Sequence, residues 1–114
     1  KACKEDQQII FDEDLTLEML IDEVRMQTRE EFINRTIKPI LSDQELITTL
    51  TKFFHCNGSL KETASTLHIH INTLHYRLKK IGELTKLNPR KLNDLLILYL
   101  AIQILDKDTK NDTN

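Results

Sequence analysis

Residues 59–85 constrain the fold of this chain most, because they predict two helices joined by a very short turn. Ser59 and Glu62 have the spacing of a capping box, in which each residue satisfies a backbone group of the other at the start of a helix. That helix ends near Leu67. A second helix follows over 71–85, so only a few residues connect the two. The pattern predicts a closely packed helical pair.

The helix at 71–85 has one apolar side and one polar side. At 100° per residue, three apolar residues fall close together and form a stripe that we expect to be buried: Leu74, Leu78 and Ile81. The opposite faces carry polar, aromatic and basic residues: Asn72, Thr73, His75, Tyr76, Lys79 and Lys80. Arg77 lies at the edge of the apolar stripe.

The turn between these helices needs residues that fit a sharp reversal. Ala64 is a small residue at the expected helix contact, and Ile69 is expected to insert into the core. His68 stands where we predict a left-handed backbone, a conformation that histidine adopts more readily than β-branched residues do. Together these residues predict a helix-turn-helix.

Charge is distributed unevenly along the chain. Residues 1–54 contain 7 basic and 12 acidic residues, a net charge of −5. Residues 55–91 contain 7 basic and 2 acidic residues, a net charge of +5, and residues 92–114 have a net charge of −2. A basic block within an acidic chain indicates a local surface that binds a polyanion.

These features favour a double-stranded DNA reader that places the helix 71–85 in the major groove. Asn72 can pair with adenine, and Thr73 can contact a thymine methyl group or a phosphate. Tyrosine, lysine and arginine side chains hold phosphates. For Arg77, a phosphate contact and a brace within the fold remain equally open. The candidate DNA-binding residues are Ser59, His70, Asn72, Thr73, His75, Tyr76, Arg77, Lys79 and Lys80.

The rest of the chain predicts further helices and an all-α fold. We expect one helix over 14–25 and a last helix over 89–105, with Asn88 as its cap and Pro89 at its first position. Two capping boxes predict the starts of two further helices between them. Thr28 and Glu31 open a helix that runs to about Lys38, and Ser42 and Glu45 open one that runs to about His55. The predicted organisation is a linker or the end of an upstream region (1–13), an N-terminal helical segment packed on the core (14–41), the helix-turn-helix domain (42–106) and a disordered tail (107–114).

At residues 57–64, 67–70, 72–81 and 83–85, the sequence resembles the C-terminal helix-turn-helix domain of the PucR and CdaR-like bacterial transcription regulators. The match includes the N-T-L-x-Y-R-L-K-x-I core, and the likeness extends loosely over residues 9–105. It implies DNA binding by a regulator controlled by small metabolites through an upstream sensing region that is absent here. The family often has arginine at the positions of Ile71 and His75, so the resemblance does not carry a base preference over to this sequence.

The predicted last helix is apolar nearly all round over residues 92–105. Such a helix is either wrapped by its own domain or shared with a partner. We expect a homodimer seam here, with residues 14–41 covering the second face as the alternative. A dimer would place two reading helices about one DNA turn, ~34 Å, apart.

Other functions fit the sequence less well. A zinc site could use His55, Cys56, His68, His70 and His75, but their spacing is not that of known zinc sites, so we expect no metal and no cofactor. A helical protein-binding module without DNA binding is the main alternative. We expect no enzymatic activity, because no nucleophile motif or phosphate-binding loop occurs. Without a long apolar run or a signal peptide, we expect a cytoplasmic location and no membrane contact.

Overall fold

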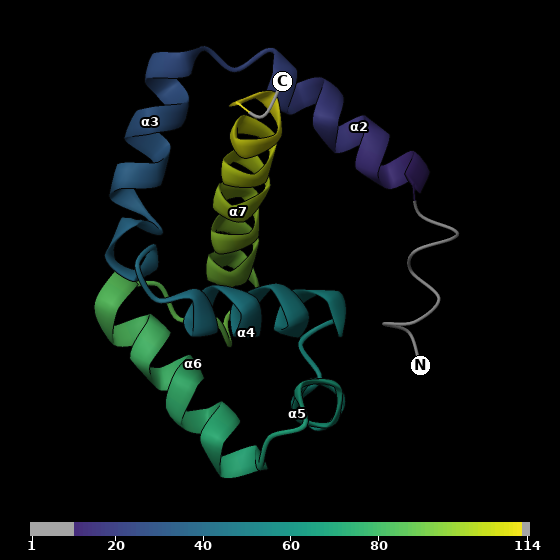
Figure 1. Cartoon of the computed structure of the whole chain (residues 1–114), viewed down its shortest axis with the longest axis vertical. Coiled ribbons are helices and arrows are strands. Elements are labelled where there is room, and N and C mark those ends of the chain that lie inside the picture. The colour runs from purple at the N-terminus through teal and green to yellow at the C-terminus, as the bar shows by residue number, and fades with distance from the viewer. Residues whose placement is uncertain (1–10, 113–114) are drawn as a thin grey trace.

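The computed structural model describes the backbone of residues 11–112 and the side chains of residues 16–108. Every element in this part of the chain is a helix, as the sequence predicts. In chain order the elements are α2 (Phe11–Asp22), α3 (Met26–Arg35), the 3-10 helix η1 (Lys38–Ile40), α4 (Gln44–His55), α5 (Leu60–Leu67), α6 (Ile71–Thr85) and α7 (Leu92–Asp112). Figure 1 shows α4 crossing the middle of the molecule, with α5 and α6 on one side and α3 and α7 on the other.

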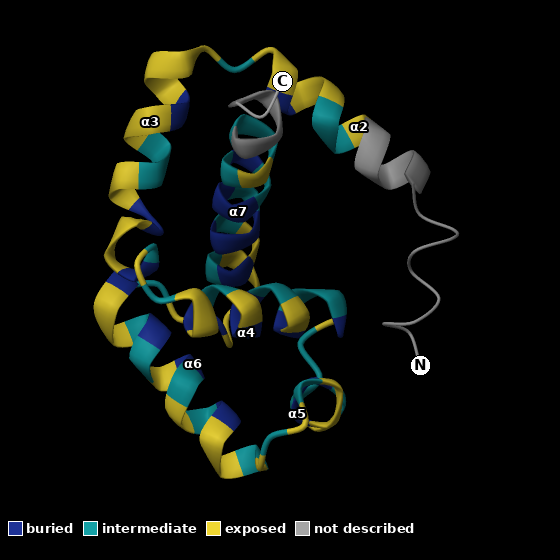
Figure 2. Cartoon of the chain, in the orientation of Figure 1, coloured by how far each residue is buried: buried dark blue, intermediate teal, exposed yellow. Residues whose placement is uncertain are grey.

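The core forms where α4 meets α6 and α7. Three residues one or two turns apart on α4, Leu46, Leu50 and Phe53, are buried there. The predicted stripe on α6 is also buried, and Figure 2 shows that the buried positions face the interior along each helix. The remaining core positions come from η1, the residue before it, and α5 and α7: Ile37, Ile40, Ala64, Leu95, Leu98, Ala101 and Ile102. Ridges of large aliphatic side chains thus hold the three helices together.

The starts of α3 and α4 differ from the prediction. The residue before α4 is Asp43, whose carboxylate accepts a hydrogen bond from the Leu46 N–H at 3.2 Å. The predicted cap Ser42 lies one residue earlier; both residue types can cap, and here the extended backbone falls at Asp43. Helix α3 begins after Arg25, which makes no side-chain cap bond, so Thr28 lies inside the helix and its predicted capping box is wrong.

Helix α7 begins at Leu92, three residues after the predicted start at Pro89. Asn88 does not cap a helix here. Its side-chain oxygen accepts the Arg90 N–H at 2.9 Å, and its own N–H donates to Asp94 at 2.9 Å. These bonds hold residues 88–91 in a turn, so the helix starts only after it.

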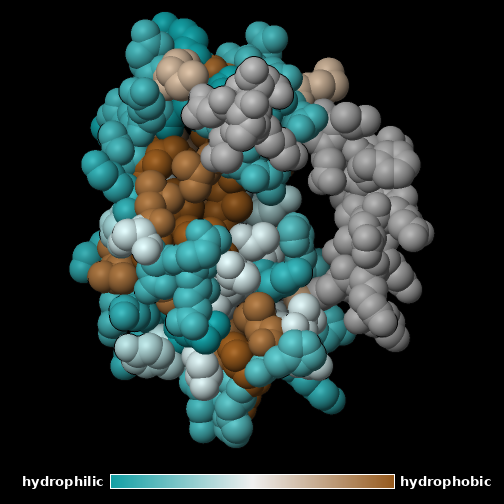
Figure 3. Space-filling model, in the orientation of Figure 1, coloured by the Kyte–Doolittle hydropathy of each residue, from teal (hydrophilic) through white to brown (hydrophobic). Residues whose placement is uncertain are grey.

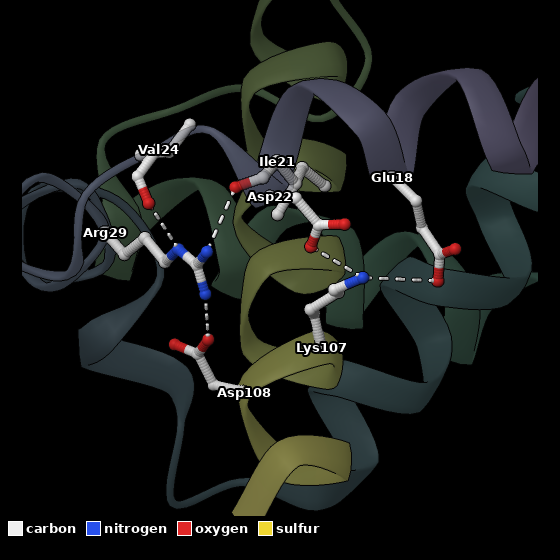
Figure 4. Close-up of polar contacts among 7 residues, drawn as sticks. All are labelled: Glu18, Ile21, Asp22, Val24, Arg29, Lys107 and Asp108. Carbon is white, nitrogen blue, oxygen red and sulfur yellow. Dashed lines mark hydrogen bonds and ion pairs between the residues drawn. The ribbon is translucent and has the colours of Figure 1, made fainter.

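The N-terminal helices are tied to the end of α7 by polar contacts, which Figure 4 shows. Arg29 is 8% exposed; its guanidinium donates to the carbonyls of Ile21 and Val24 and pairs with Asp108 at 2.7 Å. Lys107 pairs with Asp22 at 2.7 Å and lies 3.8 Å from a Glu18 oxygen. The Ile21 carbonyl, in the last turn of α2, also accepts the Val24 N–H at 3.0 Å. Arg29 therefore adds a second donor at Ile21 and donates to the Val24 carbonyl just after the helix.

These contacts correct the predicted ends of the domain. α7 continues to Asp112, so residues 107–112 of the predicted disordered tail are helical. Helix α2 begins at Phe11, so the last part of the predicted linker is helical too. Partners on α2 and α3 stabilise the last turns of α7, which local sequence alone does not favour. Residues 1–10 and 113–114 lie outside the described residues.

Most of the apolar surface of α7 is covered by its own domain. Helices α3 and α4 pack against it, and Phe54 of α4 stacks on Tyr99 with ring centroids 3.5 Å apart. Figure 3 shows apolar side chains filling the space between α3 and α7 that is open between the ribbons of Figure 1. Leu92 and Leu96 stay exposed. Among the described residues, no helix is both long enough and apolar enough to cross a membrane.

Candidate nucleic-acid interface

Helix α5 is built as the sequence predicts. The Ser59 side chain accepts a hydrogen bond from the Glu62 N–H at 3.2 Å and so caps the helix. Ala64 is buried where α5 meets α6. Its small side chain lets the two helices approach closely.

The turn after α5 has the predicted left-handed residue. His68 has φ 59° and ψ 43°, and its N–H donates to the carbonyls of Ala64 and Ser65. The Ile69 N–H also donates to the Ala64 carbonyl, at 3.0 Å, and the Ile69 side chain packs against the core. His70 then begins α6, with its Nδ1 accepting the Asn72 N–H at 3.0 Å. The angle between the two helices is therefore held by backbone bonds and by one core side chain.

Helix α6 presents the predicted polar face to solvent. Asn72, Thr73, Tyr76 and Lys79 are exposed, and Tyr76 is 62% exposed despite its aromatic ring. Lys80 is half-buried, with its Nζ 5.9 Å from the centre of the Tyr76 ring. In the described part of the chain, the side chains of Asn72 and Thr73 have no hydrogen-bonding partner in the protein.

Arg77 points into the fold. Its guanidinium donates to the Thr49 hydroxyl at 3.1 Å and pairs with Glu45 at 3.0 Å, and the side chain is only 16% exposed. Thr49 is itself fully buried in α4. Of the two roles left open by the sequence, the geometry corresponds to the brace between α6 and α4.

Three other candidates also contact the protein. Ser59 and His70 use their side chains as helix caps. His75, half-buried, has its Nδ1 bonded to the guanidinium of Arg90 in the connection between α6 and α7. Arg90 was not among the residues selected from the sequence. Its place in the basic block was the available signal, but it lies beyond the helix-turn-helix itself.

The histidines do not gather as metal ligands. His68 and His70 flank the turn, whereas His55 ends α4. Within residues 16–108, no three His, Cys, Asp or Glu side chains come close enough together to hold a metal ion.

The sequence from α4 to α7 matches a known domain. The model of the PucR C-terminal helix-turn-helix domain matches residues 46–104, just over half of the chain. The chain belongs to the PucR family. The match begins in α4 and ends in α7, so it contains the helix-turn-helix together with the two helices that form its core.

Relatives of known sequence extend the similarity to most of the chain. The uncharacterized protein YsfB of Bacillus subtilis is 48% identical over 89% of this chain and 27% of its own length. The carbohydrate diacid regulator of Escherichia coli is 36% identical over 82% of this chain and 25% of its own length. The chain thus spans about a quarter of the length of these two relatives.

A solved structure has the same fold. The regulator of polyketide synthase expression from Bifidobacterium adolescentis superposes with a TM-score of 0.62 at 30% identity, over 68% of this chain and 34% of that one. Together with the family match, this shows that the chain contains the helix-turn-helix domain of the PucR family.

Proposed function

We propose that this domain binds double-stranded DNA sequence-specifically, with α6 in the major groove. The observation that carries the proposal is the outward face of α6. Asn72 and Thr73 lie in its first turn, where recognition helices meet base edges, and both are exposed. A polar pair without protein partners is free to hydrogen-bond to bases.

The proposed roles follow from side-chain chemistry. Asn72 presents an amide that can donate to and accept from adenine at once, and Thr73 offers a methyl group and a hydroxyl. Tyr76, Lys79 and Lys80 follow on the same helix and would bind phosphates, which position the helix on the duplex without reading sequence. Arg77 would act through the fold, by fixing the angle of α6 on α4.

The regulator as a whole would respond to a small metabolite through a region upstream of this domain. Support comes from the relatives, of which this chain spans about a quarter. One of them is named for carbohydrate diacids and others for activation of transcription, including a proline-responsive activator of Bacillus subtilis.

The domain would bind DNA as a homodimer through residues 92–105. Since α3 and α4 cover most of α7, the surface left for a partner centres on Leu92 and Leu96, one turn apart and 80% and 47% exposed. Two copies would place their α6 helices about one DNA turn, ~34 Å, apart on a pseudo-palindrome.

Fluorescence anisotropy tests DNA binding. The chain is titrated into a labelled pool of random-sequence duplexes across a salt series, and the pool is then used to select a preferred site. We expect log affinity to fall linearly with log salt, as several phosphate contacts require. Absence of binding at low salt, together with a stable complex with another protein, would instead favour the protein-binding alternative.

A further inference from the structure

The connection between α6 and α7 forms a basic groove beside the proposed recognition helix. Its volume is about 680 Å³. Four cationic side chains line it, Lys79 from α6 and Lys86, Arg90 and Lys91 from the connection, against two acidic ones, Glu83 and Asp94. All four cations are exposed, so the groove presents its charge to solvent.

The backbone of this connection is held in place from several sides. Thr85, buried at the end of α6, bonds through its hydroxyl to the carbonyl of Ile81 and to the backbone of Leu87. Lys86 adopts a left-handed conformation with φ 65°, and Pro89 is fully buried. A fixed backbone presents its basic side chains without a large ordering cost.

Packing brings the connection close to α6. A Cβ atom at Gly82 would lie 3.6 Å from the Leu87 carbonyl and 3.6 Å from the Pro89 ring. These are ordinary van der Waals distances, so the connection packs directly against α6 at Gly82. This close approach carries Arg90 alongside the recognition helix.

Arg90 reaches back along α6 to His75. An arginine is only a donor, so its guanidinium donates to Nδ1 of His75. Arg90 and His75 then lie together on one edge of α6, where the remaining guanidinium N–H groups are available as donors. Thr73 and Lys80 lie toward the other edge of the helix.

We propose that Arg90, oriented by His75 and supported by Lys86 and Lys91, binds a backbone phosphate of DNA on the His75 edge of α6. The inference rests on the proposed function, since a helix in the major groove is flanked by a phosphate backbone on each side. Guanidinium groups match phosphate oxygens with two parallel hydrogen bonds, and the contact would be independent of sequence.

The test compares variants of the whole chain with the random-duplex pool in a salt series from 50 to 200 mM. Arg90→Ala should lower affinity for all sequences and reduce the salt slope by ~0.9, the value for one phosphate of B-DNA. Its deficit relative to the wild type should then shrink about 3.5-fold across that fourfold range of salt. Arg25→Ala removes an exposed cation far from α6, at the connection of α2 and α3 in Figure 1, and should leave the slope unchanged.

Lys86→Asn is a second variant, because asparagine tolerates the left-handed backbone while removing the charge. It should also lower the slope. If Arg90→Ala and Lys86→Asn behave like Arg25→Ala while the wild type binds, the inference is wrong and the proposed function stands. A wild-type chain that binds no duplex would overturn both.

Discussion

Arg77 of the proposed recognition helix pairs with Glu45 of α4 at 3.0 Å while its second nitrogen holds the buried Thr49 hydroxyl at 3.1 Å. Glu45 is 67% exposed, so solvent screens much of the ion pair. The bond to Thr49 lies deeper and is screened less. The relationship links the orientation of α6 to the first turns of α4.

Replacing Arg77 should therefore destabilise the domain moderately. We expect Arg77→Ala to lower the free energy of unfolding by about 1–2 kcal/mol, the sum of a hydrogen bond and a weak ion pair. Urea unfolding measures this. Glu45→Gln is the matched control and should cost less than about 1 kcal/mol, because the Thr49 bond remains. Equal losses of stability in the two variants would contradict the conclusion that the Thr49 hydrogen bond contributes more than the ion pair with Glu45.

The pair of Arg29 and Asp108 should matter more, because it joins residues 79 positions apart and the guanidinium is nearly buried. Asp108→Asn leaves the charge of Arg29 without its carboxylate. We expect a loss of about 2–4 kcal/mol, below the upper range for fully buried pairs since Asp108 is 29% exposed. Thermal unfolding measures it, and Glu30→Gln, which neutralises an exposed carboxylate on the residue next to Arg29, is the control. A loss no larger than that of the control would show that the pair contributes little.

The contacts of Lys107 predict that the stability of the domain depends on pH in the alkaline range. Its hydrogen bond to Asp22, together with the charges of Asp22 and Glu18, raises the pKa of the Lys107 ammonium above its ordinary value. A raised pKa in the folded state means that the added stability is complete below the unfolded pKa of about 10.4 and is lost as pH rises through the folded value. The stability difference between the wild type and Lys107→Met should therefore be constant near neutral pH and shrink above about pH 10. Denaturant unfolding at several pH values measures this difference, and a difference that grows toward alkaline pH would contradict the assignment.

Periodicity predicts the helix-turn-helix closely because its determinants are local. The stripe of Leu74, Leu78 and Ile81, the Ser59 cap and the left-handed His68 each depend on neighbours within a turn or two. The helix over 71–85 accordingly has the predicted bounds.

The features that the sequence did not predict depend on contacts between residues distant in sequence, or on residues that suit two different local structures. Lys107 and Asp108 extend α7 because their partners lie on α2 and α3, which no local pattern reveals. Asn88 bonds to the Arg90 N–H in a turn, although the same Asn-Pro pair also suits a helix start. The direction of Arg77 depends on Thr49, 28 residues earlier, so helical angle alone left both of its roles open.

Ser59 caps α5 and is also a candidate DNA-binding residue, so substitutions there can distinguish a loss of stability from a loss of DNA contact. Ser59→Ala removes the bond to the Glu62 N–H and should cost about 1 kcal/mol, whereas Ser59→Asp keeps an acceptor and should cost less. Thermal unfolding of both variants measures this. Loss of DNA affinity in Ser59→Ala at a temperature where the domain stays folded would indicate a DNA contact in addition to the cap.

The reading face of α6 should divide into residues that recognise sequence and residues that hold the backbone. Asn72→Ala should reduce the preference for the selected site over a random duplex by about 1–3 kcal/mol, because a bidentate contact to one base is lost. Lys79→Ala should weaken binding to both duplexes alike and lower the salt slope by about 1, since a phosphate contact carries no sequence information. Both side chains are exposed, so neither change should disturb the core. Anisotropy with the two duplexes, at matched salt, measures affinity and preference together. An unchanged preference in Asn72→Ala, with the same uniform loss as Lys79→Ala, would mean that the first turn of α6 meets the backbone and that another part of the protein reads the bases.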